Sequence, residues 1–183
     1  IGGREKTGSL TMNRALQSFQ IGSTTKPLTV YSPGINEGIF TLASTFDNEP
    51  LNFGSWSIVN TPATYTGMTS VRFALSHSIN IVAVLAQQKV GVTLSAAYGE
   101  AFGLTITTSG TANDMNGAAL ALGGYTYGQT PLAVADAYTT FPNGGYRITP
   151  TFYTKVEDVN GNVILTADQK TVQVIKDSTA FLI

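Results

Sequence analysis

The sequence predicts an α+β fold that is mainly helical and has a small β-hairpin near its C-terminal end. Segments with helix start and stop signals recur through the first three quarters of the chain. After residue 145 the pattern changes to short strand-like runs around Asn160-Gly161, a dipeptide typical of tight hairpin turns. At 183 residues the chain can form one domain with its own core.

The first expected helix carries the run Ser23-Thr24-Thr25-Lys26. We expect residues 24–31 to be helical and Pro33-Gly34 to end the helix. Ser23 then lies at the helix start, and Lys26 lies one turn on, on the same face. A serine alcohol needs a nearby base to attack a carbonyl, and a lysine becomes that base when its surroundings lower its pKa. The spacing therefore indicates a candidate nucleophile and its base.

Local signals also give the remaining elements. Residues 35–68 show no clear period, so we expect a long irregular segment there, and we expect a second loop over 105–117. Polar caps, glycines and prolines mark the other helices. The expected helices cover residues 71–76 after Thr69 or Ser70, 81–89 after an Asn80 cap, 94–102 after Thr93, and 132–141 after Thr130-Pro131. The expected hairpin pairs residues 151–156 with 163–166.

A second motif, Ser78-Ile79-Asn80, falls at the junction of two expected helices. A serine at such a junction can present its hydroxyl to a cleft and relay a proton. Asn80 can both donate and accept hydrogen bonds, so it could hold a lysine and a substrate amide together. The alternative is that Asn80 only caps a helix. Ser23-x-x-Lys26 and Ser78-x-Asn80 are the only S-x-x-K and S-x-N runs in the chain.

Composition excludes several classes of function. The net charge is −1 and only 11% of residues are charged, with no basic stripe, so a nucleic-acid partner is not expected. No run of about 18 apolar residues is present, so we expect no membrane span within the chain. The chain has no cysteine, which excludes disulfides and thiol catalysis. It has one histidine, which makes a Ser-His-Asp triad or a multi-histidine metal site hard to build. We expect neither a metal nor another cofactor.

The two motifs resemble the signature that penicillin-binding proteins share with class A β-lactamases. Over almost its whole length the chain resembles the transpeptidase domain of class A (bifunctional) penicillin-binding proteins. The resemblance implies the transpeptidase or serine β-lactamase-like fold, with residues 1–183 as a truncated, mainly helical part of one domain. Besides the two motifs, the matching landmarks are Ile1-Gly2-Gly3-Arg4, Asn13-Arg14-Ala15, Ala121-Leu122-Gly123-Gly124, Thr130-Pro131-Leu132 and Asn143-Gly144-Gly145.

The resemblance also implies a chemistry. Ser23 would attack the D-Ala-D-Ala bond of a peptidoglycan stem peptide, D-Ala would leave, and an acceptor amine of a second stem would take the acyl group. β-Lactam antibiotics would acylate the same serine. Lys26 would act as the base, Ser78 would pass on a proton, and Asn80 would position Lys26 and the substrate. The parent protein would work on the extracytoplasmic face of the bacterial membrane, with an anchor and a glycosyltransferase domain outside this chain.

The third motif of the family, Lys-Thr/Ser-Gly, is expected on a strand after the second motif. The chain has Lys6-Thr7-Gly8, but this run precedes Ser23, and we interpret it as a coincidence. The motif strand is therefore expected past Ile183, on a longer chain or on a separate fragment, and this chain alone could be inactive. Two alternatives stay open: a β-lactam-sensing receptor, and a serine β-lactamase, for which Glu100 is the nearest candidate base but lacks the E-x-x-L-N pattern.

Overall fold

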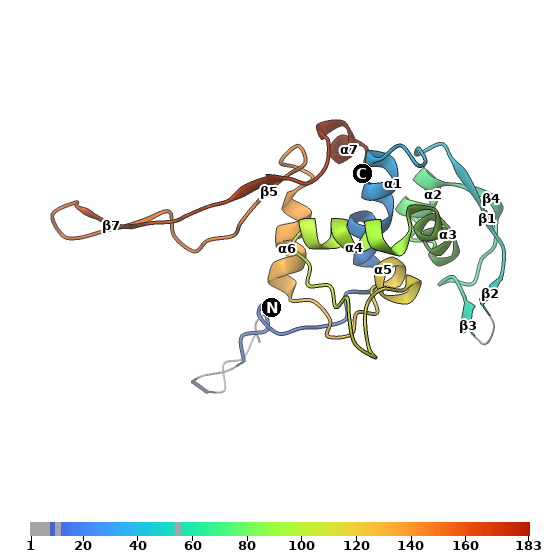
Figure 1. Ribbon diagram of the computed structural model, residues 1–183, viewed down its shortest axis with the longest axis horizontal. Coiled ribbons are helices and arrows are strands. Elements are labelled where there is room, and N and C mark those ends of the chain that lie inside the picture. The colour runs from blue at the N-terminus through green and yellow to red at the C-terminus, as the bar shows by residue number, and fades with distance from the viewer. Residues whose placement is uncertain (1–7, 10–11, 54–55) are drawn as a thin grey trace.

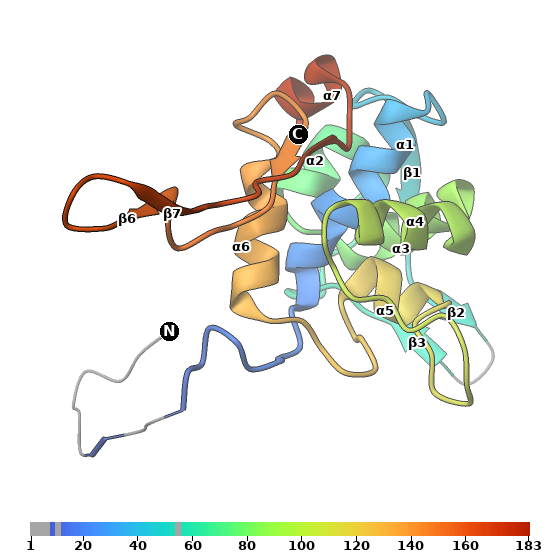
Figure 2. The same ribbon diagram turned by 60° about the vertical axis from the view of Figure 1, so that its left-hand side comes forward.

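Helices form the body of the molecule, and a long β-hairpin arm projects from one side of it (Figure 1). The structure is a computed structural model that describes residues 8–9, 12–53 and 56–183. The Ile1-Gly2-Gly3-Arg4 landmark and the Lys6-Thr7 pair lie outside the described residues. Turning the molecule leaves the arm clear of the helical body, so the separation is real and not an effect of one view (Figure 2).

The segment that carries the first motif is one continuous helical run with three kinds of turn. A 3₁₀ turn, η1 (Gly22–Thr24), leads to a π turn, η2 (Pro27–Tyr31), and then to the α-helix α1 (Ser32–Asn36). The prediction that Pro33-Gly34 ends the helix is wrong. Proline lacks only its own N–H, so the run loses one hydrogen bond at Pro33, while the Pro33 carbonyl still accepts from the backbone N–H of Glu37 and the helix continues.

In the described part of the chain, six further helices build the body: α2 (Val71–Ser76), α3 (Asn80–Val90), α4 (Val92–Ala101), α5 (Gly117–Leu122), α6 (Pro131–Thr139) and α7 (Asp177–Leu182). Of the two caps proposed for α2, Ser70 is confirmed, because its side chain accepts a hydrogen bond from the backbone N–H of Phe73. Helix α6 begins at Pro131 as predicted, and the Thr130 side chain caps it by accepting from Ala133. Helix α4 begins before Thr93. Neither α5, capped by Asn116, nor α7 was predicted from the sequence.

The segment from 35 to 68 is more ordered than expected, because two antiparallel pairs form in it or at its end. Strand β1 (Thr45–Asn48) pairs with β4 (Gly67–Ser70), with Thr45 opposite Ser70 and Asn48 opposite Gly67. Strand β2 (Leu51–Phe53) pairs with β3 (Trp56–Ile58). The chain between β1 and β4 is thus a long excursion whose two ends are held together by backbone hydrogen bonds.

A C-terminal hairpin was predicted and forms the tip of the arm, but its first strand begins at Lys155 and not at Thr151. Strand β6 (Lys155–Glu157) pairs with β7 (Val163–Thr166), and the arm is closed at its base by β5 (Tyr146–Ile148) and β8 (Thr171–Gln173). Within the described residues every sheet has two strands. The arm leaves the helical body beside α6 and returns to it at α7 (Figures 1 and 2).

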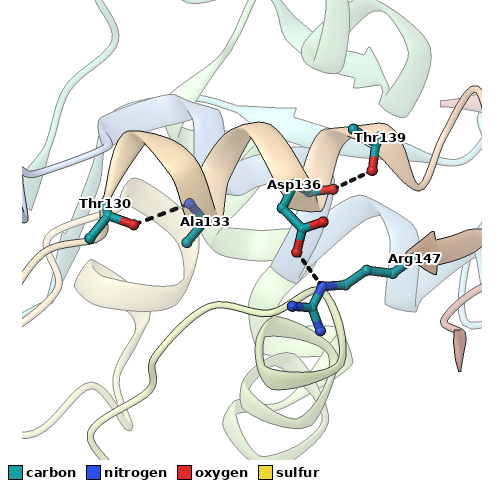
Figure 3. Close-up of polar contacts among 5 residues, drawn as sticks. All are labelled: Thr130, Ala133, Asp136, Thr139 and Arg147. Atoms are coloured by element: carbon teal, nitrogen blue, oxygen red, sulfur yellow. Dashed lines mark hydrogen bonds and ion pairs between the residues drawn. The ribbon is translucent and has the colours of Figure 1, made fainter. Parts of the chain in front are cut away.

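An ion pair fixes the base of the arm to α6. Arg147 on β5 lies 2.6 Å, Nε to Oδ2, from Asp136 on α6, whose side chain is almost fully buried (Figure 3). Gly103 makes room for this contact, since a Cβ atom there would stand 2.5 Å from the Arg147 guanidinium. Truncating either partner would leave the other charge without its partner in a largely dry place, which is costly.

Two hydrophobic clusters lie on either side of the helical run from Gly22 to Asn36. Val30 and Tyr31 belong to one cluster, which includes most of α3, while Leu28 belongs to the other. As predicted, α3 is buried on nearly all sides. No single helix in the described ranges has the length and apolarity to cross a membrane; α3 and α4 meet that test only as a pair bent by 98°. The segment that carries Ser23 and Lys26 is therefore held by packing on both sides.

Candidate active site

Ser23 stands exposed in η1, at the start of the helical run. The chain enters this turn through Gly22, whose φ of +54° is unfavourable for residues with a Cβ atom. The backbone N–H of Thr24 donates to the Ile21 carbonyl, and the Tyr138 hydroxyl donates to the Thr24 carbonyl at 2.9 Å. Contacts on both sides of Ser23 thus fix its backbone while its hydroxyl remains open to solvent.

Lys26 is buried, with 1% of its surface exposed, although it is a charged residue type. Its Nζ atom donates to three acceptors: the Ser78 carbonyl at 2.7 Å, the Ser78 Oγ at 3.1 Å and the Asn80 Oδ1 at 2.7 Å. An ammonium group has three N–H donors, so these acceptors satisfy all of them. The predicted base and both polar residues of the second motif therefore meet at one nitrogen atom.

All three partners of Lys26 are uncharged. Burial therefore acts on the amine without a carboxylate to offset it, and it lowers the pKa of Lys26 from 10.5 to about 8. At pH 7 an amine with that pKa is neutral in about one molecule in ten, whereas an ordinary lysine is neutral in fewer than one in a thousand. The surroundings of Lys26 thus supply the neutral amine that a base requires.

Ser78 adopts the left-handed backbone conformation, with a φ of +54°, and no other described residue except glycine has a positive φ. This conformation costs about 1 kcal/mol for a residue with a Cβ atom. It turns both the carbonyl and the hydroxyl of Ser78 toward Lys26. Such an outlier persists only where its surroundings enforce it, and it often marks a functional site.

Asn80 is the first residue of α3, so the prediction that it caps this helix is wrong. Its Nδ2 atom donates to the Val59 carbonyl at 2.8 Å, which leaves Oδ1 facing Lys26. The cap comes instead from Asn60, twenty residues earlier: its Oδ1 accepts from the backbone N–H groups of Asn80 at 3.0 Å and Ile81 at 3.2 Å. The side chain of Asn80 is thereby free to contact Lys26.

Sequence reasoning missed the residues that support the site from outside the two motifs. Asn60 is one of them, and no local pattern distinguishes it from other polar residues in an irregular segment. Tyr125 is another. Its hydroxyl lies 2.5 Å from the Oγ1 atom of Thr25, the residue directly before Lys26 in the sequence. Gly123 is a third, since a Cβ atom there would stand 2.1 Å from the Gly22 carbonyl oxygen. From the sequence, Gly123 was only one residue of a landmark shared with the family, and no contact with Gly22 was predicted for it.

Two hollows share residues with the two motifs. Thr24 lines an apolar groove together with Ile21, Val134 and Tyr138. Ser78 lines a smaller pocket, which residues such as Thr66 make more polar.

The structure brings three of the four predicted site residues into hydrogen-bond contact: Lys26, Ser78 and Asn80. Among the described residues Ser23 has no side-chain hydrogen bond, and it stands one turn before Lys26. Glu100, considered from the sequence as a deacylation base, is exposed on α4. The four residues provide a hydroxyl on a helix start, a buried amine, a second hydroxyl and an amide, a set suited to acyl transfer to serine.

Comparisons with known proteins agree with this geometry. The family model described as the penicillin binding protein transpeptidase domain matches residues 3–183. Over 194 residues the chain is 36% identical to penicillin-binding protein 1A of Clostridium botulinum (strain Langeland), covering 100% of this chain and 23% of that protein. It is 34% identical over 167 residues to penicillin-binding protein 1A of Vibrio cholerae, covering 87% of this chain and 19% of the relative.

Solved structures give the same result. The crystal structure of penicillin-binding protein 1A from Haemophilus influenzae superposes with a TM-score of 0.77 at 26% identity, covering 93% of this chain and 30% of that one. Penicillin-binding protein A from M. tuberculosis, solved as an imipenem acyl-enzyme complex, has the same fold, with a TM-score of 0.80 at 22% identity over 93% of this chain and 43% of that one.

The chain belongs to the penicillin-binding protein transpeptidase family, and its fold is that of the transpeptidase domain. The predicted fold class and family resemblance are confirmed. The chain spans about a quarter of the length of the curated relatives it matches.

Proposed function

We propose that this chain carries the acylation centre of a D,D-transpeptidase that crosslinks peptidoglycan stem peptides through an acyl-serine intermediate. The observation that supports this best is the buried amine of Lys26, held by Ser78 and Asn80 with no carboxylate among its partners. A buried lysine is expensive to keep in a core. Its retention beside an exposed serine at a helix start favours a role in proton transfer.

In the proposed reaction the Ser23 Oγ attacks the carbonyl of the D-Ala-D-Ala bond, and neutral Lys26 accepts the proton that the hydroxyl loses. The Ser78 hydroxyl, 3.1 Å from the Lys26 Nζ, passes a proton to the departing D-Ala amine. Negative charge develops on the substrate oxygen near the start of the helical run, where backbone N–H groups are free of helical partners. The acceptor amine of a second stem then takes the acyl group and frees Ser23.

The same route accounts for the proposed reaction with β-lactams. Attack by Ser23 breaks the ring amide, but the amine remains bonded to the acyl group through the rest of the antibiotic, so no fragment departs and the whole product stays on the serine. Asn80 holds Lys26 through Oδ1, and we propose that it also contacts the substrate amide. The partners are then the stem peptides, with their acceptor amine, and β-lactam antibiotics. We propose that the whole protein works at the extracytoplasmic membrane face, anchored through a segment outside this chain.

The test is intact-mass analysis after incubation with a labelled penicillin, on this chain and on a form extended past Ile183. Ser23→Ala removes the nucleophile, and Ser18→Ala is the control, because Ser18 is another exposed serine just before the helical run. We expect one label on the extended wild type and on Ser18→Ala, and none on Ser23→Ala. Release of D-Ala from a stem pentapeptide, measured with and without an added amine, tests the transfer itself.

The outcomes separate the alternatives. A label that is lost again within minutes would indicate a hydrolase rather than a transpeptidase. Acylation without any D-Ala release would indicate a β-lactam-sensing receptor. A folded, extended protein that takes no label would refute the proposed function. Label on the extended form alone would show that a strand outside this chain completes the site.

A further inference from the structure

Asn60 connects the excursion between β1 and β4 to the start of α3. It is 5% exposed, and all of its hydrogen-bonding capacity is used. Its Oδ1 accepts the backbone N–H groups of Asn80 and Ile81, while its Nδ2 donates to Asn48 Oδ1 at 2.7 Å and to the Thr64 carbonyl at 2.8 Å. A buried amide with every donor and acceptor in use has one orientation only.

The residue before Asn60 acts on the side chain of Asn80. The Val59 carbonyl accepts from Asn80 Nδ2, and this bond decides which end of the Asn80 amide faces Lys26. If the amide turned over, its NH₂ group would face the Nζ donors of Lys26, and the contact would be lost. Residues 59 and 60 therefore hold the backbone of Asn80 and select the orientation of its side chain.

Asn60 is itself held by the core. Asn48, which accepts from Asn60, is fully buried at the end of β1, opposite Gly67 of β4. The Asn48 Nδ2 donates in turn to Thr66 Oγ1 at 2.9 Å. A continuous series of hydrogen bonds thus runs from the β1–β4 pair through Asn48, Asn60 and Asn80 to the amine of Lys26.

We propose that Asn60 is a positioning residue for acyl transfer: it sets the place of Asn80, and through Asn80 the place of the Lys26 amine. The effect on acyl transfer rests on the proposed function. That Asn60 holds Asn80, and through it the Lys26 amine, does not depend on that function. Asn60 does not touch the Lys26 amine or the reacting atoms, so its effect passes through the start of α3.

The chain offers a matched control in Asn36. This amide is similarly buried, at 9% exposure, and also makes four side-chain hydrogen bonds, to Glu37, Tyr98, Lys176 and Thr179. It ties α1 to α7 and not to the start of α3. Asn36→Ala should therefore destabilise the fold about as much as Asn60→Ala, without disturbing Asn80.

The first measurement is the rate of acylation by penicillin as a function of pH, in the form of the protein that acylates. We expect Asn60→Ala to lower the plateau rate by about tenfold or more, a typical effect of a misplaced proton-transfer group, and Asn36→Ala to leave it within about twofold. Asn60→Asp keeps an oxygen that can accept both N–H groups, but it loses the two donated bonds to Asn48 and Thr64. It should restore part of the plateau, because the start of α3 keeps its cap.

A double-mutant cycle tests whether Asn60 acts through Asn80. If it does, adding Asn60→Ala to Asn80→Ala should lower the acylation rate little further, because the group it positions is already gone. Fully additive effects, or a plateau in Asn60→Ala equal to that in Asn36→Ala, would overturn the proposal. If Asn60→Ala does not fold, Asn60→Ser carries the test, because its shorter side chain cannot reach both N–H groups of Asn80 and Ile81 from the same place. A plateau in Asn60→Ser equal to that in Asn36→Ala would then overturn the proposal.

The second measurement needs no acylation: the pKa of Lys26, followed by NMR on lysine labelled at Cε and assigned by comparison with Lys26→Arg. Burial is what lowers this pKa, so loosening the Ser78–Asn80 segment should let water in and raise the pKa toward its ordinary value. We expect this in Asn60→Ala and not in Asn36→Ala. Equal pKa values in both would overturn the positioning role. A wild type that never acylates would refute the proposed function and leave this measurement valid.

Discussion

Gly123 lies so close to Gly22 that a Cβ atom on it would stand 2.1 Å from the Gly22 carbonyl oxygen. Its φ of +75° also places it in the left-handed region. The C-terminal end of α5 is thus pressed directly against the turn that presents Ser23. No side chain fits between the two segments. The position of Ser23 therefore depends on residue 123 having no side chain.

Gly123→Ala should therefore displace the turn at Gly22 and lower both stability and acylation by penicillin. The steric overlap with backbone and the unfavourable φ together should cost about 2 kcal/mol or more. Gly161→Ala is the control, because Gly161 has a φ of +83° but open space around it at the hairpin tip. Chemical denaturation should show a smaller loss for Gly161→Ala, with no change in acylation. Equal losses would mean that the contact with Gly22 is not the cause.

The rate of acylation should follow the neutral form of Lys26. Because burial lowers the pKa of this amine to about 8, the rate should rise about tenfold per pH unit below pH 8 and level off above it. Lys26→Arg should take no label at any pH, since arginine stays charged. A wild-type rate that is flat from pH 6 to about 9 would contradict the role of Lys26 as base.

The same pKa shift has a consequence for stability. The folded chain holds Lys26 with a pKa near 8 and the unfolded chain with one near 10.5, so the unfolded state binds more protons between these values. The contribution of Lys26 to stability should therefore rise as pH increases from about 8 to 10.5. Urea denaturation of the wild type and of Lys26→Met across this range should show the free energy of unfolding of the wild type rising relative to that of the variant.

Ser78 should reveal its backbone strain in a pair of substitutions. Ser78→Ala and Ser78→Gly both remove the hydroxyl that contacts Lys26, so both should lose acylation. Glycine tolerates a φ of +54° without penalty, and the Gly variant should be more stable than the Ala variant by about 1 kcal/mol. Urea denaturation checks the order. An Ala variant at least as stable as the Gly variant would show that the conformation carries no strain.

Asp114 should make the fold sensitive to acid. It is buried, and although burial alone would raise its pKa, hydrogen bonds from Thr107 and Thr126 lower it below 3.8. The stabilisation is then present above pH 3.8 and is lost as pH falls through the folded-state pKa. Thermal unfolding of Asp114→Asn should depend less on pH in this window than that of the wild type. Identical profiles would contradict this assignment.

Helices whose signals are local could be predicted from the sequence, and so could the hairpin. Ser70 and Thr130 cap helices through residues three positions away, so a short window contains the whole cause. The pairing of Thr45 with Ser70 could not be read in this way, because its partners are far apart and most of the residues between them are polar and aperiodic. Helix α5 is short and rich in small residues, and nothing in its pattern separates it from the loop before it.

In the candidate site, too, the residues within short motifs could be predicted, and a residue on a distant segment could not. The two motifs and their order pointed to Ser23, Lys26, Ser78 and Asn80, and the structure brings the last three together. Asn80 was also expected to cap its helix, which is the usual role of an asparagine at that place. The actual cap, Asn60, lies on a distant segment, and only the folded chain shows that the two meet.

The π turn η2 lies between Lys26 and the part of the helical run that is anchored in the core. A π turn holds one more residue than an α turn but completes the same revolution. If one residue were deleted from Pro27–Tyr31, the turn would relax to α geometry, and Ser23 and Lys26 would keep their orientation relative to α1. An inserted residue cannot be absorbed in this way, because the turn is already widened, and it would rotate Ser23 and Lys26 by about 100°, away from Ser78 and Asn80. The run therefore tolerates shortening by one residue better than lengthening.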